Sequence, residues 1–331
     1  MTTGVWEPGA VPAKRIGYVE LYVGDLNSSL DYFIDALGFV ETARTVGAGI
    51  ESVRLAQGSF RLRVSTGPAT AAFVDGHGDG IADIALVCDD VAATRDQAVS
   101  AGARILPGGA VSGFGDVRHT LLPGDATGTT QVPGGLIREL DHVAVCVDAT
   151  TLASSVQFYV DGFGMEVYSS EYLEIGGQAM DSVVVRSPSG GVTFTILEPD
   201  PTKNVGQIDA FLERNSGAGV QHLAFLVDDI VSVVRHYQTR GVEFLSTPGS
   251  YYDVLTERLG EMGEEIADLR SANVLADRDE WGYLLQLFSR SPYERNTLFY
   301  ELIQRRGARG FGSANIRALY EAVERDRLAI E

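Results

Sequence analysis

Residues 78–91 read GDGIADIALVCDDV and residues 217–230 read GAGVQHLAFLVDDI, and the two stretches align without a gap at a constant offset of 139 residues. Each stretch contains an apolar run typical of a buried strand, and each run ends at an Asp-Asp pair. An acidic residue after such a run is a helix start signal, and both following segments end in glycine, at Gly102 and Gly241. We therefore expect the same strand and helix in both halves, followed by a further strand at 103–106 and at 242–245.

A second pair of stretches has the same order of features. Residues 16–40 read IGYVELYVGDLNSSLDYFIDALGFV and residues 140–165 read LDHVAVCVDATTLASSVQFYVDGFGM. In both, an apolar run is followed by residues rich in Asp, Ser, Thr and Asn and then by a helical pattern. Apolar residues recur at i, i+3, i+4 and i+7, namely Leu30, Phe33, Ile34 and Leu37 in the first stretch and Val156, Tyr159, Val160 and Phe163 in the second. The chain thus contains four related units, two per half, which predicts an α+β fold built from paired βαβββ modules.

The length of the chain favours two domains. A single hydrophobic core rarely grows to serve 331 residues. Residues 123–135 read PGDATGTTQVPGG, which is rich in turn residues and has no periodicity. We predict an N-terminal domain at 1–124, a linker at 125–136 and a C-terminal domain at 137–331.

The composition restricts the partners and the compartment. The chain has 26 basic and 45 acidic residues, a formal net charge of −19, which disfavours nucleic acid and anionic membranes and favours a small-molecule partner. Cys88 and Cys146 lie in apolar runs of separate halves, which predicts buried free thiols in a reducing compartment. Residues 1–12 lack the order of a signal peptide, and no apolar stretch is long enough to span a bilayer. We expect a soluble, cytoplasmic protein.

The two halves differ at two strand positions. His142 and His222 in the second half correspond to Tyr18 and Asp83 in the first half. A single strand histidine is more often a hydrogen-bonded core residue than a metal ligand. Two histidines at equivalent positions of paired modules favour a metal site, because the symmetry brings both to facing strands of one curved sheet. We expect the first domain, which lacks both histidines, to hold no metal site.

A third ligand is expected from a late strand. Residues 297–304 read TLFYELIQ and place Glu301 in an apolar strand, where a lone carboxylate is costly to bury unless it is paired or metal-bound. The alternative is a structural salt bridge from Glu301 to Arg305 or Arg306. Two imidazoles and one carboxylate leave coordination positions open and suit non-haem Fe(II), whereas the two cysteines exclude a closed Cys-rich zinc site.

These residues lie in motifs that resemble a known family. The tandem-module plan resembles the vicinal-oxygen-chelate (glyoxalase/bleomycin-resistance) superfamily, in which each domain is a curved open barrel. Residues 138–325 resemble the 4-hydroxyphenylpyruvate dioxygenases and 4-hydroxymandelate synthases through DHVA at Asp141, GQIDAFL at Gly206, GAGVQHLAF at Gly217, FLSTPGSYYD at Phe244, GYLLQLF at Gly282 and FYELIQRRG at Phe299. The first half also fits, chiefly through GYVELYV, DGIADIAL and VSGFGDVRHTLL. The resemblance implies that His142, His222 and Glu301 are the catalytic ligands of an Fe(2+) ion.

The resemblance also implies a substrate and two possible products. Both enzymes decarboxylate 4-hydroxyphenylpyruvate oxidatively with O2 and release CO2. The synthases then hydroxylate the benzylic carbon and form 4-hydroxymandelate, whereas the dioxygenases attack the ring and form homogentisate. The carbon that reacts depends on how the pocket holds the substrate.

Two departures from the dioxygenase pattern favour the synthase. Residues 195–198 read TILE where the dioxygenases typically have Pro-Leu-Asn-Glu, and Thr195 and Leu197 share one face of the strand. Ile316 stands where the dioxygenases usually have an aromatic residue. The alternative is that these are neutral packing changes in a homogentisate-forming 4-hydroxyphenylpyruvate dioxygenase.

The resemblance assigns further residues to the substrate pocket. Ser182, Gln207 and Gln286 match polar pocket residues, and Phe311 matches an aromatic residue that closes over the substrate. Ordinary backbone hydrogen bonding is the alternative for the three polar side chains. Residues 315–331 are predicted to form a C-terminal helix that covers the iron site and excludes water, although a purely structural capping helix would show the same pattern.

Two other function classes fit the sequence less well. Ring-cleaving extradiol dioxygenases share the triad but need an additional basic residue, and the remaining second-domain histidine, His236, lies off the apolar face of its helix. Metal-free binding or resistance modules are usually single short domains and need no histidine at both repeat positions. Resemblance to the synthases further implies a homodimer through the first domain and a product used for 4-hydroxyphenylglycine in antibiotic biosynthesis.

Overall fold

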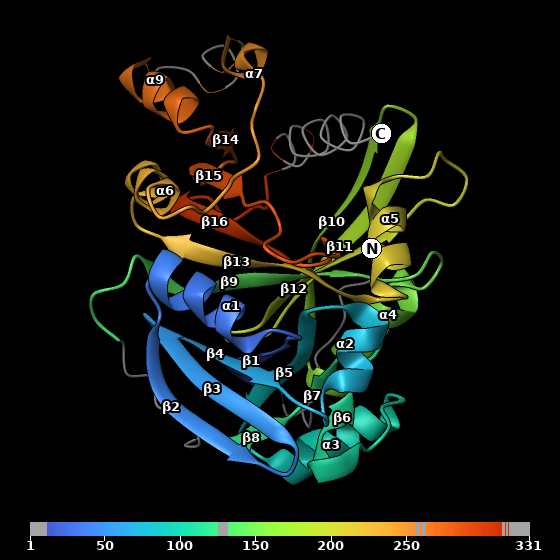
Figure 1. Cartoon of the computed structure of the whole chain (residues 1–331). Helices are drawn as coiled ribbons and strands as arrows, with labels where there is room; N and C mark the ends of the chain where they lie inside the picture. Colours follow the sequence, from blue (N-terminus) through green and yellow to red (C-terminus); the bar gives the residue numbers. More distant parts are fainter. Residues whose placement is uncertain are drawn as a thin grey trace.

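The structure, a computed structural model, describes residues 12–124, 132–253, 255, 259, 263–312, 315 and 317. Two eight-stranded mixed sheets organise them, one from each half of the chain (Figure 1). The predicted α+β fold of two tandem domains with paired βαβββ modules is confirmed. The bounds 1–124, 125–136 and 137–331 stay predictions, and most of the C-terminal helix predicted at 315–331 lies outside the described residues.

The first sheet has the strand order β2-β3-β4-β1-β5-β7-β6, with β8 paired to β5. Its elements are β1 (Ala13–Tyr22), α1 (Leu26–Leu30), the π-helical η1 (Asp31–Ala36), β2 (Val40–Gly47), β3 (Ile50–Gln57), β4 (Phe60–Thr66), α2 (Ala71–His77), β5 (Gly80–Cys88), α3 (Val91–Ser100), the short η2 (Pro107–Gly109), β6 (Val111–Ser112), β7 (Arg118–His119) and β8 (Leu121–Pro123).

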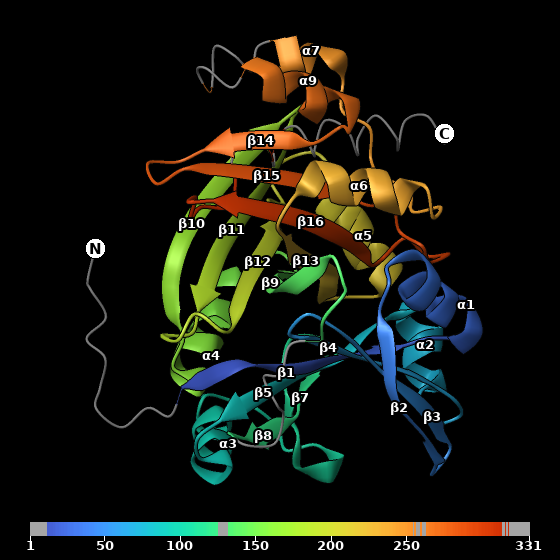
Figure 2. The ribbon, with the colours of Figure 1, turned by 90° about the vertical axis from the view of Figure 1, so that its left-hand side faces the viewer.

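The second sheet has the strand order β10-β11-β12-β9-β13-β16-β15-β14. Its elements are β9 (Ile137–Cys146), α4 (Leu152–Phe163), β10 (Glu166–Ile175), β11 (Gln178–Arg186), β12 (Thr193–Pro199), α5 (Gln207–Asn215), β13 (Gly219–Val227), α6 (Ile230–Gln238), α7 (Gly249–Asp253), α9 (Gly263–Ser271), β14 (Leu275–Arg278), β15 (Tyr283–Phe288) and β16 (Phe299–Arg306). In Figure 2, β10–β12 and β14–β16 run in clearly different directions, so this sheet curls into a half-barrel.

Local sequence signals explain where the helices begin and end. The side chains of Asp25, Asp90 and Asp229 accept hydrogen bonds from the first turns of α1, α3 and α6, as expected for N-cap residues. Gly164 ends α4 in the left-handed conformation, with φ of 62°, which glycine adopts without strain. None of the helices in the described ranges has the length and apolar character needed to cross a bilayer.

Two predicted strands are reduced to single bridges. Residues 103–106 contribute one bridge, from Ile105 to Val111, and residues 242–245 contribute one, from Phe244 to Ser289. The predictions of full strands there were wrong. Each segment meets only the end of a strand, Val111 at the start of β6 and Ser289 directly after β15, so neither extends into a ladder.

The two domains share one hydrophobic core. Tyr32 of η1 stacks on Tyr300 of β16, with ring centroids 5.7 Å apart. Phe60 of β4 lies against Phe225 of β13, with centroids 5.3 Å apart. On the other side, α3 packs on α4, where Gln97 donates a hydrogen bond to the Asp161 carbonyl at 2.8 Å (Figure 2). The N-terminal domain therefore supports the back of the sheet that carries the predicted ligands.

Candidate metal centre and cavity

Three strands bring the predicted metal ligands together. In the antiparallel pair β9–β13, His142 lies opposite Ala224 and His222 lies opposite Ala144. In the parallel pair β13–β16, Glu301 also lies next to Ala224. The period-2 alternation of strands puts all three ligands on one face of the sheet. The small side chains between them leave the centre of that face open.

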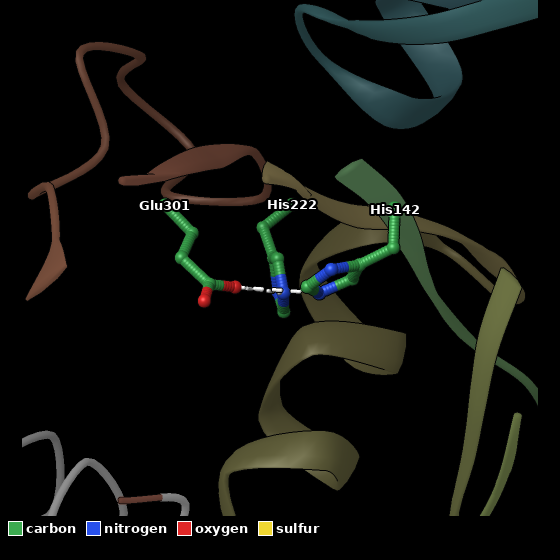
Figure 3. A group of neighbouring side chains, drawn as sticks. All are labelled: His142, His222 and Glu301. Atoms are coloured by element: carbon green, nitrogen blue, oxygen red, sulfur yellow. Dashed lines mark ion pairs between the residues drawn. The ribbon is translucent and has the colours of Figure 1, made fainter. Parts of the chain in front are cut away.

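The three side chains converge on one point (Figure 3). One nitrogen or oxygen atom from each lies within 4.8 Å of the others. His142 Nε2 and His222 Nε2 are each 3.3 Å from Glu301 Oε2. The residues are 4%, 8% and 1% exposed, in the order His142, His222 and Glu301. Three donors this close and this deeply buried are arranged as ligands of one metal ion.

The charges in this group compensate one another. Burial alone would raise the pKa of Glu301, but the two imidazoles lower it to about 2, so the carboxylate is ionised. Burial alone would lower the pKa of His142, but the Glu301 charge and the Asp141 hydrogen bond raise it to about 9. Burial lowers the pKa of His222, and the same Glu301 charge does not reverse this. The charge of Glu301 therefore keeps one proton on the two histidines, at His142. A divalent metal ion can replace the positive charge of this proton.

Each ligand is oriented by a second hydrogen bond on its far side. His142 Nδ1–H donates to Asp141 Oδ1 at 2.9 Å. His222 Nδ1–H donates to the Gln221 side-chain oxygen at 3.2 Å. In the neutral imidazole both contacts keep the proton on Nδ1 and leave Nε2 available to a metal, which is the usual arrangement of metal-ligating histidines.

Glu301 is held by an amide and not by an arginine. Gln286 Nε2 donates to Glu301 Oε1 at 2.7 Å, and Asn315 Nδ2 donates to Gln286 Oε1 at 2.8 Å. Arg305 instead forms a two-pronged ion pair with Asp141 at 2.7 and 2.8 Å. Arg306 pairs with Glu265 at 2.8 Å. The alternative of a salt bridge from Glu301 to either arginine is therefore wrong.

The donor set fits a divalent cation. Two imidazole nitrogens and one carboxylate oxygen approach from one side, and the opposite side opens into a cavity. Donors on one side leave coordination positions for a substrate and for a small molecule such as O2.

The cavity beside the ligands has a volume of about 60 Å³. Its lining includes the predicted residues Thr195, Leu197, Gln207, Gln286 and Phe311, and also Met180, Ile208, Gln221 and Phe288, which the sequence reasoning did not single out. Gln221 precedes the ligand His222, and Phe288 ends the GYLLQLF motif, so both could have been found from the motifs. Because pockets for small organic ligands measure roughly 300 to 1,000 Å³, the cavity must widen to admit a substrate.

Thr195 has a polar atom available in this cavity. Its Oγ1 is buried and has no hydrogen-bond partner among the described residues. An unpaired buried hydroxyl is unfavourable, and a ligand can satisfy it. Leu197 is two residues further along β12, so its side chain lies on the same face of the strand.

Ser182 and Ile316 stand apart from these residues. The Ser182 hydroxyl donates to the Glu171 carbonyl at 3.1 Å, and Ser182 lies opposite Leu197 in the β11–β12 ladder without lining the cavity. Ile316 lies outside the described residues.

The equivalent face of the first sheet is filled by an ion-pair network. Asp83, at the position of His222, accepts from Arg118 Nε at 3.1 Å and from Thr120 Oγ1 at 2.5 Å, and its other oxygen accepts from the Thr120 backbone at 3.0 Å. Glu20, at the position of Ala144, lies opposite Asp83 and adds a second buried carboxylate. Both Asp83 oxygens are thus already bonded to side chains and backbone of the same domain.

A larger hollow lies elsewhere, between the domains. It measures about 650 Å³ and is lined by residues of α1, η1 and the segment after α6, with acidic side chains such as Asp31, Asp35 and Asp79. It contains none of the three metal ligands, so we assign the chemistry to the smaller cavity.

Comparisons with known proteins agree with this geometry. A family model described as "Glyoxalase/Bleomycin resistance protein/Dioxygenase superfamily" matches residues 15–119 and 139–287. A solved structure of a triple mutant of 4-hydroxymandelate synthase from Streptomyces coelicolor superposes with a TM-score of 0.89 at 51% sequence identity, over 96% of this chain and 99% of that one. The 4-hydroxyphenylpyruvate dioxygenase of Yarrowia lipolytica is 31% identical over 94% of this chain and 91% of its own length. That of Neurospora crassa is 34% identical over 76% of this chain and 70% of its own length.

Proposed function

The chain belongs to the 4-hydroxyphenylpyruvate dioxygenase and 4-hydroxymandelate synthase family of the glyoxalase/bleomycin resistance/dioxygenase superfamily, and on this premise we propose that it is an Fe(II)-dependent 4-hydroxymandelate synthase. It would convert 4-hydroxyphenylpyruvate and O2 to 4-hydroxymandelate and CO2.

One observation carries the proposal. The buried His142–His222–Glu301 group lies in a chain that is 51% identical, over nearly its full length, to a solved 4-hydroxymandelate synthase. Identity to the two dioxygenases above is 31% and 34%. The 2-His-1-carboxylate set with open positions is the ligand set of non-haem Fe(II) oxygenases, which supports iron as the metal.

The residues of the site would divide the work as follows. His142, His222 and Glu301 hold the iron, which supplies a binding site for the 2-oxo acid and the activation of O2. Gln286 keeps Glu301 in place by its 2.7 Å hydrogen bond, so that Glu301 Oε2 faces the metal position. Phe311, whose ring centroid is 5.2 Å from that of His142, shields the ligand from water.

The remaining cavity residues would position the aromatic ring. Thr195 offers its unpaired hydroxyl to the substrate, and Leu197 adds branched bulk on the same strand face. Gln207 at the start of α5 would supply a further polar contact. We infer that this arrangement would hold the benzylic carbon nearer to the metal position than the ring carbon, and that this geometry would select the reacting carbon.

The test is a product assay. Purified protein is loaded with Fe(II) and incubated with 4-hydroxyphenylpyruvate in air, and the products are separated by liquid chromatography and identified by mass. We expect 4-hydroxymandelate as the main product, with one CO2 released per substrate. Homogentisate as the sole product would make the protein a dioxygenase of the same family, which is the alternative that the fungal relatives favour.

A matched pair of variants ties the activity to the triad. His142→Ala removes a ligand and should abolish both iron binding and turnover. His236→Ala removes an exposed histidine on α6, away from the site, and should leave both unchanged. Iron content that is unaffected by His142→Ala would overturn the ligand assignment.

The setting of the enzyme follows from the same proposal. It would act in the cytoplasm, as a homodimer through residues 1–124. Its product would supply 4-hydroxyphenylglycine for a peptide antibiotic. Sedimentation analysis of the purified protein tests the dimer.

A further inference from the structure

Arg305 lies behind the metal ligands and binds none of them directly. It follows Glu301 by four residues on β16, so both side chains are on the same face of the strand. Its Nε and Nη2 donate to the two carboxylate oxygens of Asp141 at 2.7 and 2.8 Å. This two-pronged geometry is specific to the planar guanidinium group, and a lysine cannot reproduce it.

Asp141 links Arg305 to the ligand His142. Its Oδ1 accepts the His142 Nδ1–H at 2.9 Å. Both of its oxygens also accept the Arg305 fork, so the mostly buried Asp141 is one partner of an ion pair. Among the described residues, the other ligand histidine, His222, has the neutral amide of Gln221 behind it, at 3.2 Å. His142 is therefore the histidine whose orientation and donor strength depend on a charged partner.

Arg305 also holds the turn that lies over His142. Its Nη1 donates to the Gly310 carbonyl at 2.7 Å and to the Ala308 carbonyl at 3.4 Å. The guanidinium carbon is 5.2 Å from the ring centroid of Phe311 in the same turn. The Phe311 ring is in turn 5.2 Å from the His142 ring. One side chain thus contacts the support of the ligand on one side and the residue that closes the cavity on the other.

We propose that Arg305 is a positioning residue that couples the turn at 307–312 to the metal ligand His142, with Asp141 as the link. This inference rests on the proposed function for the identity of the metal ion. Loss of the guanidinium fork would free Asp141 to rotate, would leave His142 without a fixed orientation, and would release the Gly310 carbonyl and with it Phe311. Metal binding at His142 would then no longer affect how the turn at 307–312 closes over the site.

The test compares the same substitution at two neighbouring residues. Arg305→Lys keeps the charge and removes the fork. Arg306→Lys makes the same change at the next residue, which pairs with the exposed Glu265 and does not touch the site. Co2+ is used as the probe in place of iron, and its dissociation constant and visible absorption spectrum are measured for both variants and for the unchanged protein. Thermal unfolding of the metal-free proteins controls for folding.

We expect Arg305→Lys to weaken Co2+ binding by about 10- to 100-fold, the range for loss of a partner behind a metal ligand, and to shift the Co2+ spectrum. Arg306→Lys should match the unchanged protein. A second readout is hydrogen exchange at 307–312: Co2+ should slow it in the unchanged protein and not in Arg305→Lys.

Two results would overturn the inference. The first is a Co2+ dissociation constant of Arg305→Lys within about twofold of that of Arg306→Lys, because differences of that size are expected between substitutions that do not interact with the site. The second is Co2+-induced protection of 307–312 that survives in Arg305→Lys. If Arg305→Lys does not fold, Asp141→Asn, which keeps the size of the side chain and removes its charge, should give the same weakening, and unchanged binding there also overturns the inference. Failure of the unchanged protein to bind Co2+ would refute the proposed function itself. Tight Co2+ binding that is the same in Arg305→Lys and in the unchanged protein would refute only this coupling.

Discussion

Raising the pH from about 6.5 to about 8.5 should strengthen divalent-metal binding to the site by about two orders of magnitude. The reason is a single proton that must leave before the metal binds. The Glu301 charge and the Asp141 hydrogen bond outweigh burial and raise the pKa of His142 to about 9. Metal ligation requires the neutral imidazole, so binding releases this proton.

The size of the effect follows from the protonation states of the three ligands. Below a pKa of about 9, each pH unit changes the apparent affinity about tenfold, or about 1.4 kcal/mol. Glu301, with its pKa of about 2, is ionised throughout this range, and burial keeps the pKa of His222 below its ordinary value, so neither adds a proton. The logarithm of the association constant should therefore rise with a slope near one and flatten only as the pH reaches about 9.

The assay is competition of the protein with a chelator for Co2+ at a series of pH values. Calorimetry in two buffers of different ionisation enthalpy counts the released protons, and we expect about one per metal. His236→Ala, which removes an exposed histidine distant from the site, should leave the slope unchanged. A slope near zero would show that His142 is already neutral, and a slope near two would show that both histidines are protonated; either result refutes the charge assignment.

Three substitutions test other parts of the structure. Thr195→Val should leave the unfolding temperature unchanged and raise KM for 4-hydroxyphenylpyruvate, because it removes a buried hydroxyl that has no partner among the described residues and that the substrate could satisfy. Gly312→Ala should destabilise the protein by about 1–2 kcal/mol in urea unfolding and weaken metal binding, because φ is +72° there and an added Cβ would lie 2.5 Å from Gln286 Oε1. Tyr159→Phe should cost about 1–3 kcal/mol of unfolding free energy and leave the activity per folded molecule intact, since it removes the partner of the buried His119 Nε2, now bonded at 2.8 Å.

The sequence predicted the ligand strands because repetition fixes register. Once the sequences of β5 and β13 are aligned, Asp83 and His222 occupy the same position. Their side chains must therefore lie on equivalent faces of two similar sheets. The edge segments at 103–106 and 242–245 were harder, since their apolar pattern does not say whether a partner strand has free hydrogen-bonding groups.

The contacts behind the ligands could not be read from the sequence. Arg305 is four residues from Glu301 and far from Asp141 in the chain, so proximity in sequence favoured the wrong ion pair. Only the tertiary structure, in which β9 and β16 flank β13, brings Asp141 within reach of Arg305. Likewise, the sequence predicted an ordinary helix at η1, because the spacing of its apolar residues does not distinguish an α-helix from a π-helix. In the structure η1 is π-helical, and the Leu37 N–H donates to the Tyr32 carbonyl at 3.0 Å.

The two domains solve one electrostatic problem in different ways. Each buries carboxylate charge on the corresponding face of its sheet, through Asp83 and Glu20 in the first domain and Glu301 in the second. In the first domain the compensating cations are Arg118 and Arg63, which cannot lose their charge and which donate hydrogen bonds to the two buried carboxylates. In the second domain the compensating charge is a proton on His142, which can leave. A removable charge beside an ionised carboxylate is the condition for exchange with a metal cation. The two imidazoles of the second domain therefore leave a charge that a metal can replace, whereas the buried carboxylates of the first domain are paired with arginines.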